Sequence, residues 1–331
     1  MPLSNLDTKL TVVLTLKDRV EFTYRWMNYA NMINMPFKII IADGGKDKTI
    51  EDFLASGKHY SNINYQYIRF PYDETYSDYY IKLASVLDMV DTEYMVLADN
   101  DDFYIVDGLR KSIDFLVNNT NYASCRGEIG GFFQKNKNEF QFGISSRESI
   151  TLDSETSADR VLQNLSNYNA SYYDVCKTEN RRIAFNKIRD ISSSDLFITE
   201  IIDSCLTVCF GKIKREEYLY LVRHNNSPES SARTLEKEND TLGRMFEKTW
   251  SHDINSFITV ISEMILKVDH SKNSQIYLLK KAYRKHLSKA IIENLSSEMS
   301  VISRFFILNS LRMDSILTNG FFRSLFRKFY S

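Results

Sequence analysis

Short apolar runs and helical stripes alternate through the first hundred residues. Four runs rich in β-branched and other apolar residues predict strands, at 10–16, 37–42, 65–70 and 94–98. Helical patterns lie between them, at 20–33, 50–55 and 79–90. Strands that alternate with helices are typical of βαβ units, so we expect a mainly parallel sheet.

The middle of the chain is less regular, and the last third is almost wholly helical in pattern. Strands are predicted at 122–125, 139–143 and 218–222, with a loop at 126–131, and helices at 158–165, 181–188 and 196–209. Beyond residue 233, one apolar stripe recurs at three-to-four spacing: Ile276, Leu279, Tyr283, Leu287 and Ile291. We therefore predict an α/β domain over 1–232, followed by a helical C-terminal region over 233–331.

Composition and charge favour a globular chain whose last part differs from its body. With 43% hydrophobic residues and a formal net charge of −1, the sequence has too much apolar surface for a disordered chain. Residues 271–331 carry a net charge of about +8, which leaves the rest acidic. Within 301–331, large aromatic residues stand beside five basic ones, a composition typical of a helix lying in an anionic membrane interface. The alternative is a helix docked on its own domain. Nucleic-acid binding is disfavoured, because the acidic body would repel phosphate.

Four cysteines, Cys125, Cys176, Cys205 and Cys209, show no Cys-x-x-Cys pair. The chain starts without a secretory signal and has no run of eighteen apolar residues. We expect buried free thiols in a cytoplasmic protein that meets the inner face of the cell membrane at most peripherally.

An acidic cluster follows the predicted strand at 94–98. Ligands of open α/β sheets bind outside the carboxyl ends of the parallel strands. Asp99-Asn100-Asp101-Asp102 places three carboxylates there, an arrangement that costs free energy unless a cation or hydrogen-bond donors compensate it. Mg²⁺ or Mn²⁺ prefers such oxygen ligands. The alternative is an acidic loop in which Asp102 or Asp107 caps the next helix. No glycine-rich phosphate-binding loop is present.

Three strand ends together resemble those of family-2-like glycosyltransferases with the GT-A fold, most closely the bacterial branch that builds surface polysaccharides. Thr15 with Asp18-Arg19, Asp43-Gly44, and the 99–102 segment as the Asp-x-Asp carry this resemblance, which covers about residues 9–232. It implies a GT-A-like, Rossmann-type, mainly parallel sheet flanked by helices.

The resemblance also implies roles for individual residues. Thr15 and Asp43 would line the base and ribose pocket, and Asp99 would contact the ribose or the diphosphate. Asp101 would hold the Mn²⁺ or Mg²⁺ ion that bridges the two phosphates. Asp102 is expected to be a helix cap or a supporting group rather than a ligand.

Two basic segments are further candidates for the donor site. Asp18 and Arg19 would contribute to it, although a salt bridge at the sheet edge would use the same pair. The segment that begins with Arg223 and His224 resembles the family's mobile loop over the diphosphate, and a solvated loop capped at Ser227 is the alternative. Arg126-Gly127-Glu128 lies where an acceptor-side loop is expected.

An inverting transferase needs a carboxylate that takes the proton from the attacking acceptor hydroxyl. The family places this base at the start of a helix, and the matching segment here spans 194–203. Glu200 is the first candidate because its apolar neighbours would raise its pKa. Asp203 and Asp195 are the alternatives, since the family's adjacent Glu-Asp pair is absent.

The sequence thus predicts a metal-dependent, inverting glycosyltransferase of surface polysaccharide synthesis. Its donor would be a nucleotide-diphosphate sugar, and its acceptor a hydroxyl of a glycan or lipid-linked glycan. A nucleotidyltransferase acting on sugar phosphates and a non-catalytic scaffold of a polysaccharide assembly complex are the alternatives. The sugar, the nucleotide, the linkage and the oligomeric state are not specified by these residues.

Overall fold

A computed structural model describes residues 5–136, 139–144, 150–168, 170–193, 195–227, 248–270 and 276–294. The chain divides into two compact units, which we treat separately. Unit 1 comprises Met1–Arg160 and Asn169–Ser227, and unit 2 comprises Val161–Tyr168 and Pro228–Ser331.

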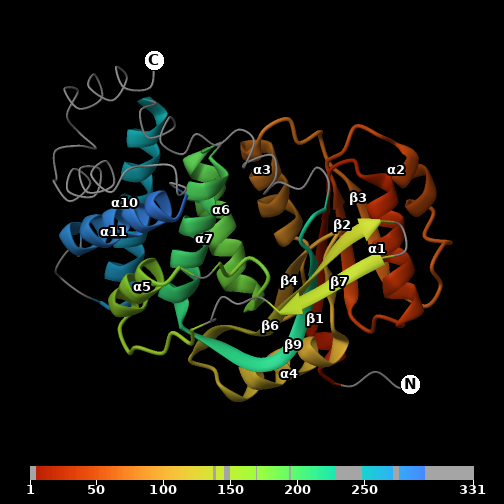
Figure 1. The fold of residues 1–331 in the computed structure, drawn as a ribbon, viewed down its shortest axis with the longest axis horizontal. Coiled ribbons are helices and arrows are strands. Elements are labelled where there is room, and N and C mark those ends of the chain that lie inside the picture. The colour runs from red at the N-terminus through yellow and green to blue at the C-terminus, as the bar shows by residue number, and fades with distance from the viewer. Residues whose placement is uncertain are drawn as a thin grey trace. The chain divides into compact units, whose positions relative to one another are not determined.

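Unit 1 contains a mixed sheet with the strand order β3-β2-β1-β4-β8-β6-β9-β5, and β7 pairs with β6 (Figure 1). The strands are β1 (Leu10–Leu16), β2 (Lys38–Asp43), β3 (Tyr65–Arg69), β4 (Tyr94–Asp99), β5 (Phe103–Tyr104), β6 (Tyr122–Asn136), β7 (Glu139–Ile144), β8 (Val175–Lys177) and β9 (Lys212–His224). The first four strands are mutually parallel, so β1 and β4 end side by side, with Thr15 opposite Asp99. β6 and β9 are also parallel, whereas β8 and β5 pair in the antiparallel sense.

Helices of unit 1 cover both faces of the sheet (Figure 1). They are α1 (Val20–Met32), α2 (Thr49–Leu54), α3 (Tyr76–Leu87), α4 (Val106–Asn118), α6 (Thr178–Ile191) and α7 (Leu196–Phe210). Helix α5 (Ser157–Ser166) begins in unit 1 and continues into unit 2. Val12 and Leu14 of β1 belong to a core cluster with residues of α1, α2 and α4. Val13, which points to the other face, is equally buried. This two-sided burial explains why the strands read as continuous apolar runs.

Unit 2 contains the helices α10 (Lys248–Val268) and α11 (Ile276–Asn294), which pack against each other. Phe257 of α10 and Tyr283 of α11 are buried, with their ring centroids 4.8 Å apart. The predicted stripe is partly seen here: Leu279 and Tyr283 are buried, while Ile276 is exposed. The segment at 301–331 lies outside the described residues. No helix within the described ranges is both long and apolar enough to cross a bilayer.

The predicted loop at 126–131 is wrong, because these residues lie inside β6. Arg126 forms a buried ion pair with Asp174 (3.0 Å), and Asp174 also pairs with Arg215 of β9 (2.9 Å). Gly127 permits the close pairing of the two strands, since a Cβ there would lie 2.1 Å from the carbonyl oxygen of Tyr218. We call Asp174, Arg126 and Arg215 the Asp174 network.

Candidate active site

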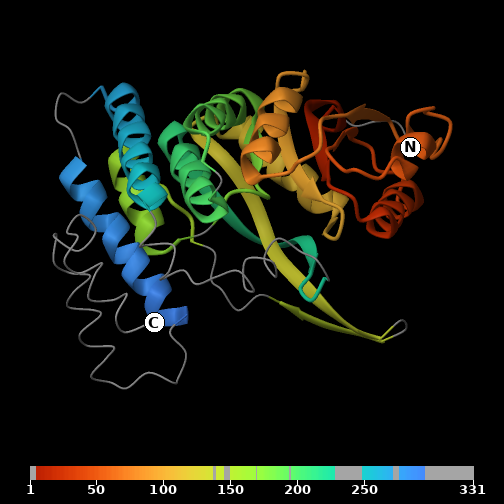
Figure 2. The same ribbon diagram turned by 90° about the horizontal axis from the view of Figure 1, so that it is seen from above.

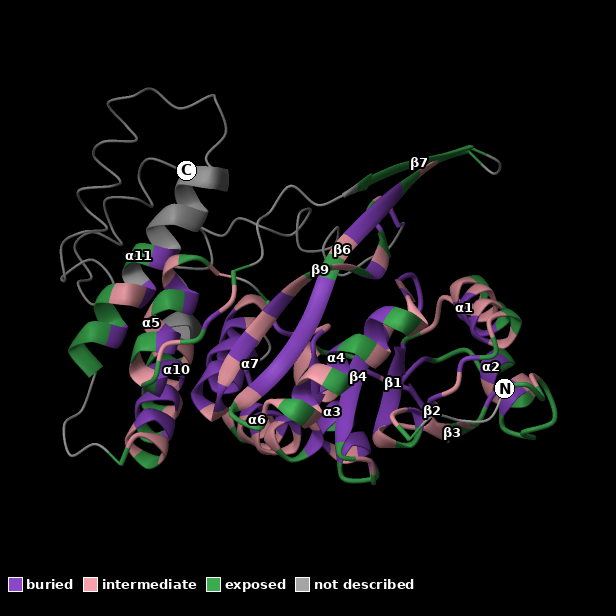
Figure 3. Ribbon diagram, turned by 90° about the horizontal axis from the view of Figure 1, so that it is seen from below, coloured by how far each residue is buried: buried purple, intermediate pink, exposed green. Residues whose placement is uncertain are grey.

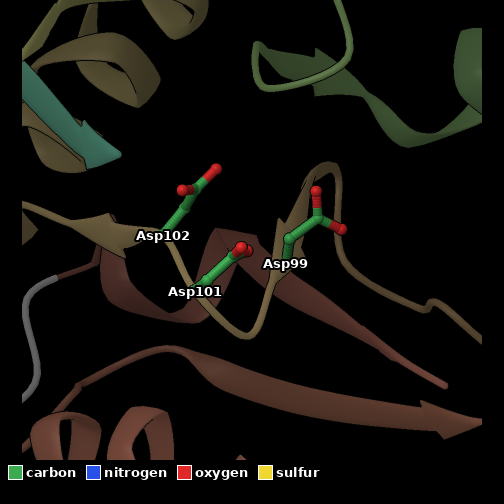
Figure 4. Close-up of side chains that lie close together, drawn as sticks. All are labelled: Asp99, Asp101 and Asp102. Carbon is green, nitrogen blue, oxygen red and sulfur yellow. The ribbon is translucent and has the colours of Figure 1, made fainter. Parts of the chain in front are cut away.

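The three carboxylates after β4 converge, as the sequence predicts. Asp99, Asp101 and Asp102 each offer one oxygen, and these oxygens all lie within 4.8 Å of one another. Figure 4 shows the three side chains projecting from the turn that joins β4 to β5. We call these three residues the acidic cluster. Its members are buried or half-buried, so their mutual repulsion is weakly screened.

Two arginines from distant segments partly neutralise the acidic cluster. Arg19, just before α1, contacts Asp101 (3.0 Å), and Arg223 near the end of β9 contacts Asp102 (3.0 Å). Burial would raise the pKa of Asp101, but the Arg19 charge and the Ser227 hydroxyl leave that pKa below its usual value. Burial raises the pKa of Asp102 to about 6, although Arg223 opposes the shift. A third guanidinium group, that of Arg25, lies close enough for its charge to interact with Asp101 and Asp102.

The expectation that Asp102 or Asp107 caps a helix is wrong. Ile105 is the N-cap residue of α4, and no side chain caps that helix. Asp102 instead accepts a hydrogen bond from the backbone N–H of His224 (3.2 Å) as well as from Arg223. Asp102 therefore ties the end of β9 to the acidic cluster.

Asp99 is held by hydroxyl groups. It accepts hydrogen bonds from Thr15 (3.1 Å), Tyr172 (3.3 Å) and Tyr173 (2.7 Å). The Tyr79 hydroxyl in turn bonds to that of Tyr172. Burial and the nearby Asp101 charge raise the pKa of Asp99. Tyr172 and Tyr173 are not predicted as site residues from the sequence, because 172–173 belongs to no predicted element.

Asp18 and Arg19 adopt the left-handed backbone conformation, with φ of 54° and 57°. Two consecutive non-glycine residues in this region are unusual and strained. The alternative of a salt bridge within the pair does not hold. Asp18 accepts hydrogen bonds from the backbone N–H groups of Lys46 and Asp47, while Arg19 bonds to Asp101 and Ser227.

Asp43 lies at the end of β2, beside the end of β1. Its two oxygens accept hydrogen bonds from the Gly45 N–H (2.8 Å), the Tyr67 hydroxyl (2.6 Å) and Arg69 (2.9 Å). Tyr67 and Arg69 come from the adjacent strand β3, so Asp43 organises this edge of the sheet. Its contact with a nucleobase stays a prediction.

The three carboxylates considered as bases have different surroundings on α7. Asp195 caps the helix by accepting a hydrogen bond from the Ile198 N–H (3.1 Å). Asp203 forms a buried ion pair with Arg181 of α6. Glu200 has no ion-pair partner within the described part of the chain; it lines a small pocket that Tyr80 and Tyr172 also line. Burial, assisted by the Asp203 charge, raises the pKa of Glu200 to about 7. Asp99 and Arg223 are close enough for their charges to affect this pKa.

The segment after β9 reaches the acidic cluster through several contacts. The His224 ring stacks on that of Phe132 at 4.6 Å, and its Nδ1 lies 3.3 Å from a guanidinium nitrogen of Arg25. Burial and the positive charge of Arg25 lower the pKa of His224, so its ring is neutral at pH 7. The solvated-loop alternative is wrong for His224 and Ser227, which are buried.

The donor set of the acidic cluster fits a divalent cation in its chemistry. Converging carboxylate oxygens are the ligands of Mg²⁺ and Mn²⁺. Arg19 already occupies one oxygen of Asp101. The four cysteines, by contrast, are buried and free, as expected.

No protein-family model and no curated protein sequence matches the chain. Solved structures do. Staphylococcus aureus TarS 1–349 in complex with UDP-GlcNAc matches with a TM-score of 0.58 at 11% identity, covering 96% of this chain and 88% of that one. TarS 1–349 without the ligand gives 0.53 at 11% identity, covering 92% and 80%. A longer TarS structure gives 0.55 at 10% identity, covering 96% and 53%. At this identity the likeness establishes the fold, and it confirms the predicted GT-A-like glycosyltransferase fold.

Proposed function

We propose that this chain is a glycosyltransferase that uses a nucleotide-diphosphate sugar and a divalent cation. The observation that carries the proposal is the acidic cluster at the end of β4, with Glu200 desolvated nearby. The fold supports it, because the matching TarS structure is a complex with UDP-GlcNAc. Carboxylates at this edge of a parallel sheet lie where such folds bind their ligands.

The acidic cluster and its arginines would bind the donor. Asp101 would hold the Mn²⁺ or Mg²⁺ ion, which would neutralise charge developing on the nucleoside-diphosphate leaving group. Asp99 would contact the ribose or the diphosphate. Arg19 and Arg223 carry fixed positive charge beside the same carboxylates, so they would bind diphosphate oxygens directly. His224 would close this side of the site. Thr15, Asp18 and Asp43 would shape the nucleoside pocket from the ends of β1 and β2.

Glu200 would accept the proton of the attacking acceptor hydroxyl. A pKa near 7 matches this task, because the carboxylate is then ionised at neutral pH and still basic enough to take a proton. Asp203 is committed to Arg181, so it would support α7 rather than react. Attack from the face opposite the leaving group would invert the anomeric configuration. The acceptor would be a hydroxyl of a glycan or lipid-linked glycan in surface polysaccharide synthesis.

Calorimetric titration of a nucleotide-sugar panel that includes UDP-GlcNAc, with and without Mn²⁺, tests this function. We expect one donor to bind, and to bind more tightly with the cation. The product configuration, read by NMR of the anomeric proton, tests inversion. Nucleotidyl transfer instead of sugar transfer, or no donor binding at all, would contradict the proposal and favour a nucleotidyltransferase or a scaffold.

We also propose that 301–331 brings the enzyme to the inner face of the cell membrane. The support is the sequence alone: large aromatic residues and a net charge of +4 in this segment. Full-length protein should float with anionic vesicles, and truncation after Ser300 should release it while leaving activity on a short soluble acceptor intact. Full-length protein that stays at the bottom of the gradient would contradict this.

A further inference from the structure

The β6–β7 hairpin extends beyond the rest of unit 1, and β7 is exposed along it (Figures 2 and 3). Phe142 is 73% exposed and Phe140 is 45% exposed. Both belong to β7, which pairs with β6. Aromatic rings that stay exposed on a projecting element add little to the core of the fold. Exposed apolar patches of this kind mark binding surfaces.

The register of the hairpin places these rings on one face. Phe142 is opposite Phe132, and Phe140 is opposite Gln134, so the four side chains lie on the same side of the two strands. Both exposed rings contact Phe132, with centroids 6.2 Å and 5.9 Å away. Phe133 points to the opposite face and is 46% exposed.

This row of rings is continuous with the candidate active site. Phe132 stacks on His224, whose backbone N–H bonds to Asp102 of the acidic cluster. Two residues on, the Asn226 side chain bonds to both backbone polar groups of Gln134 (2.8 Å each). The hairpin is therefore fastened to the segment that closes the site, and its rings lead outward from there.

The charge of the hairpin narrows the choice of ligand. Beyond Gly130 the described charges are Lys135 and Glu139, which pair with each other at 3.4 Å, and the sequence adds only Lys137. A nearly neutral surface gains little from anionic lipid, whose attraction requires several basic residues. Flat rings beside a carboxamide suit a saccharide, because pyranose rings present apolar C–H faces and hydroxyl edges.

We propose that Phe140, Phe142 and Gln134, supported from below by the buried ring of Phe132, form an extended saccharide-binding surface that holds the acceptor chain beyond the reacting sugar. This inference rests on the proposed function for the meaning of "acceptor". The exposed rings stack on sugar units of a glycan chain, and the row guides its end toward His224 and the acidic cluster. The ligand class is an oligosaccharide or polysaccharide.

The test compares the full chain with two variants on an array of immobilised oligosaccharides, followed by NMR titration of the strongest binder. In Phe140→Ala/Phe142→Ala both rings of the proposed surface are removed. In Phe133→Ala a ring of similar exposure is removed from the other face, which makes it a matched control. We expect the double variant to lose affinity by about tenfold or more, and the control to bind as the parent does. Circular dichroism should show all three chains folded.

Several outcomes would overturn the proposal. They are a parent chain that binds no saccharide on the array, equal binding by parent and double variant, and equal loss in the Phe133→Ala control. Loss of flotation with phosphatidylglycerol–phosphatidylcholine vesicles in the double variant, without a change in saccharide binding, would assign the rings to lipid. A parent dimer that the double variant dissociates, seen by sedimentation velocity, would assign them to a second copy of this chain.

Donor titration in parallel separates this inference from the proposed function. If UDP-GlcNAc or another donor binds parent and double variant equally while only the parent binds saccharide, both stand. Donor binding without saccharide binding overturns the hairpin surface alone. Saccharide binding that depends on the two rings, in a chain that binds no donor, supports the surface and overturns the transferase.

Discussion

The acidic cluster and the Asp174 network belong to the same sheet but differ in how their charges are paired. In the acidic cluster, Asp101 and Asp102 each pair with an arginine, whereas Asp99 has no ion-pair partner within the described part of the chain. In the Asp174 network, two guanidinium groups surround one carboxylate. The Asp174 network joins β6, β9 and the residue before β8 inside the unit, and Ser124 adds a hydrogen bond to Asp174 at 2.7 Å. The acidic cluster lies at the carboxyl end of β4.

The difference separates charges that hold the fold from charges that await a ligand. The two buried guanidinium groups of the Asp174 network share one carboxylate. Removing that carboxylate would leave both charges buried without a counter-charge, which would strongly destabilise the fold. Converging carboxylates at a strand end, one of them without an ion-pair partner among the described residues, favour binding of a cation. Asp203 and Glu200 repeat the contrast on one helix, since only Asp203 has an arginine partner.

The largest effect is expected at Glu200. Glu200→Gln should lower the sugar-transfer rate by about 10²–10⁴-fold, because the attacking hydroxyl loses its base. Donor affinity should be unchanged by calorimetry. The neighbouring Asp203→Asn variant should instead reduce thermal stability, since it breaks the pair with Arg181. Normal transfer by Glu200→Gln together with loss in Asp203→Asn would move the base three residues along α7.

Asp174→Asn should lower the free energy of unfolding by about 3–5 kcal/mol, because it leaves two buried guanidinium groups without a counter-charge. Urea denaturation measures this. Asp190→Asn is the control, since its pair with Arg189 is on the surface and should contribute less than about 1 kcal/mol. Equal stability of the two variants would contradict the structural role assigned to the Asp174 network.

The transfer rate at saturating substrate should fall by about tenfold per pH unit below pH 7 and level off above it, because Glu200 must be ionised to act as the base. The charges of Asp203, Asp99 and Arg223 influence the pKa of Glu200. Folding raises the pKa of Glu200, so its contribution to stability is present at low pH and is lost as pH rises from about 5 through 7. Glu200→Gln should make both the transfer rate and the unfolding free energy less dependent on pH. A wild-type transfer rate that stays constant between pH 5 and 8 would argue against Glu200 as the base.

Asp101→Ala should weaken donor binding in the presence of Mn²⁺ by about 10- to 100-fold, because it removes a proposed ion ligand. Calorimetry with and without Mn²⁺ measures the loss, and circular dichroism checks that the variant is folded. The exposed Asp107, in the first turn of α4, supplies the control Asp107→Ala. Donor affinity equal to wild type in Asp101→Ala would show that the acidic cluster binds no ion.

The smallest effect is expected for Tyr173→Phe, which removes one of three hydroxyls on Asp99 and keeps the ring under Arg223. We expect a loss of about 1 kcal/mol in unfolding free energy, the usual value of one hydrogen bond. The exposed Tyr277 provides the control Tyr277→Phe. A loss of unfolding free energy as large as that of Asp174→Asn would show that Asp99, like Asp174, mainly stabilises the fold.

The predictable parts of the fold were those in which burial decides the residue pattern. β1 is buried along its whole length, and its predicted and observed bounds agree. Arg126 is predicted to lie in a loop, because the sequence near it gives no sign of the distant Asp174 that pairs with its buried charge. For the same reason β9 is much longer than the predicted strand at 218–222.

The site follows the same division. The strand rule brought Thr15 and the acidic cluster together, and the structure confirms that placement. Tyr172 and Tyr173 escaped notice, since their hydroxyls matter only once Arg181, by bonding to the backbone of Ser171 and Tyr172, fixes the course of that segment. The residues next to Tyr172 and Tyr173 in the sequence indicate neither the contact with Arg181 nor the course of the backbone there.

The left-handed pair Asp18–Arg19 has an evolutionary consequence. Each such residue costs about 1–2 kcal/mol relative to glycine in that conformation, a backbone cost that glycine at either position would remove. At position 19 the same change would delete the charge that faces Asp101. Selection for heat resistance alone would therefore drift toward glycine at this turn and away from catalysis, whereas selection for turnover keeps the strained arginine. The left-handed backbone of Asp18 and Arg19 therefore lowers the thermal stability of this protein in exchange for the position of the Arg19 charge.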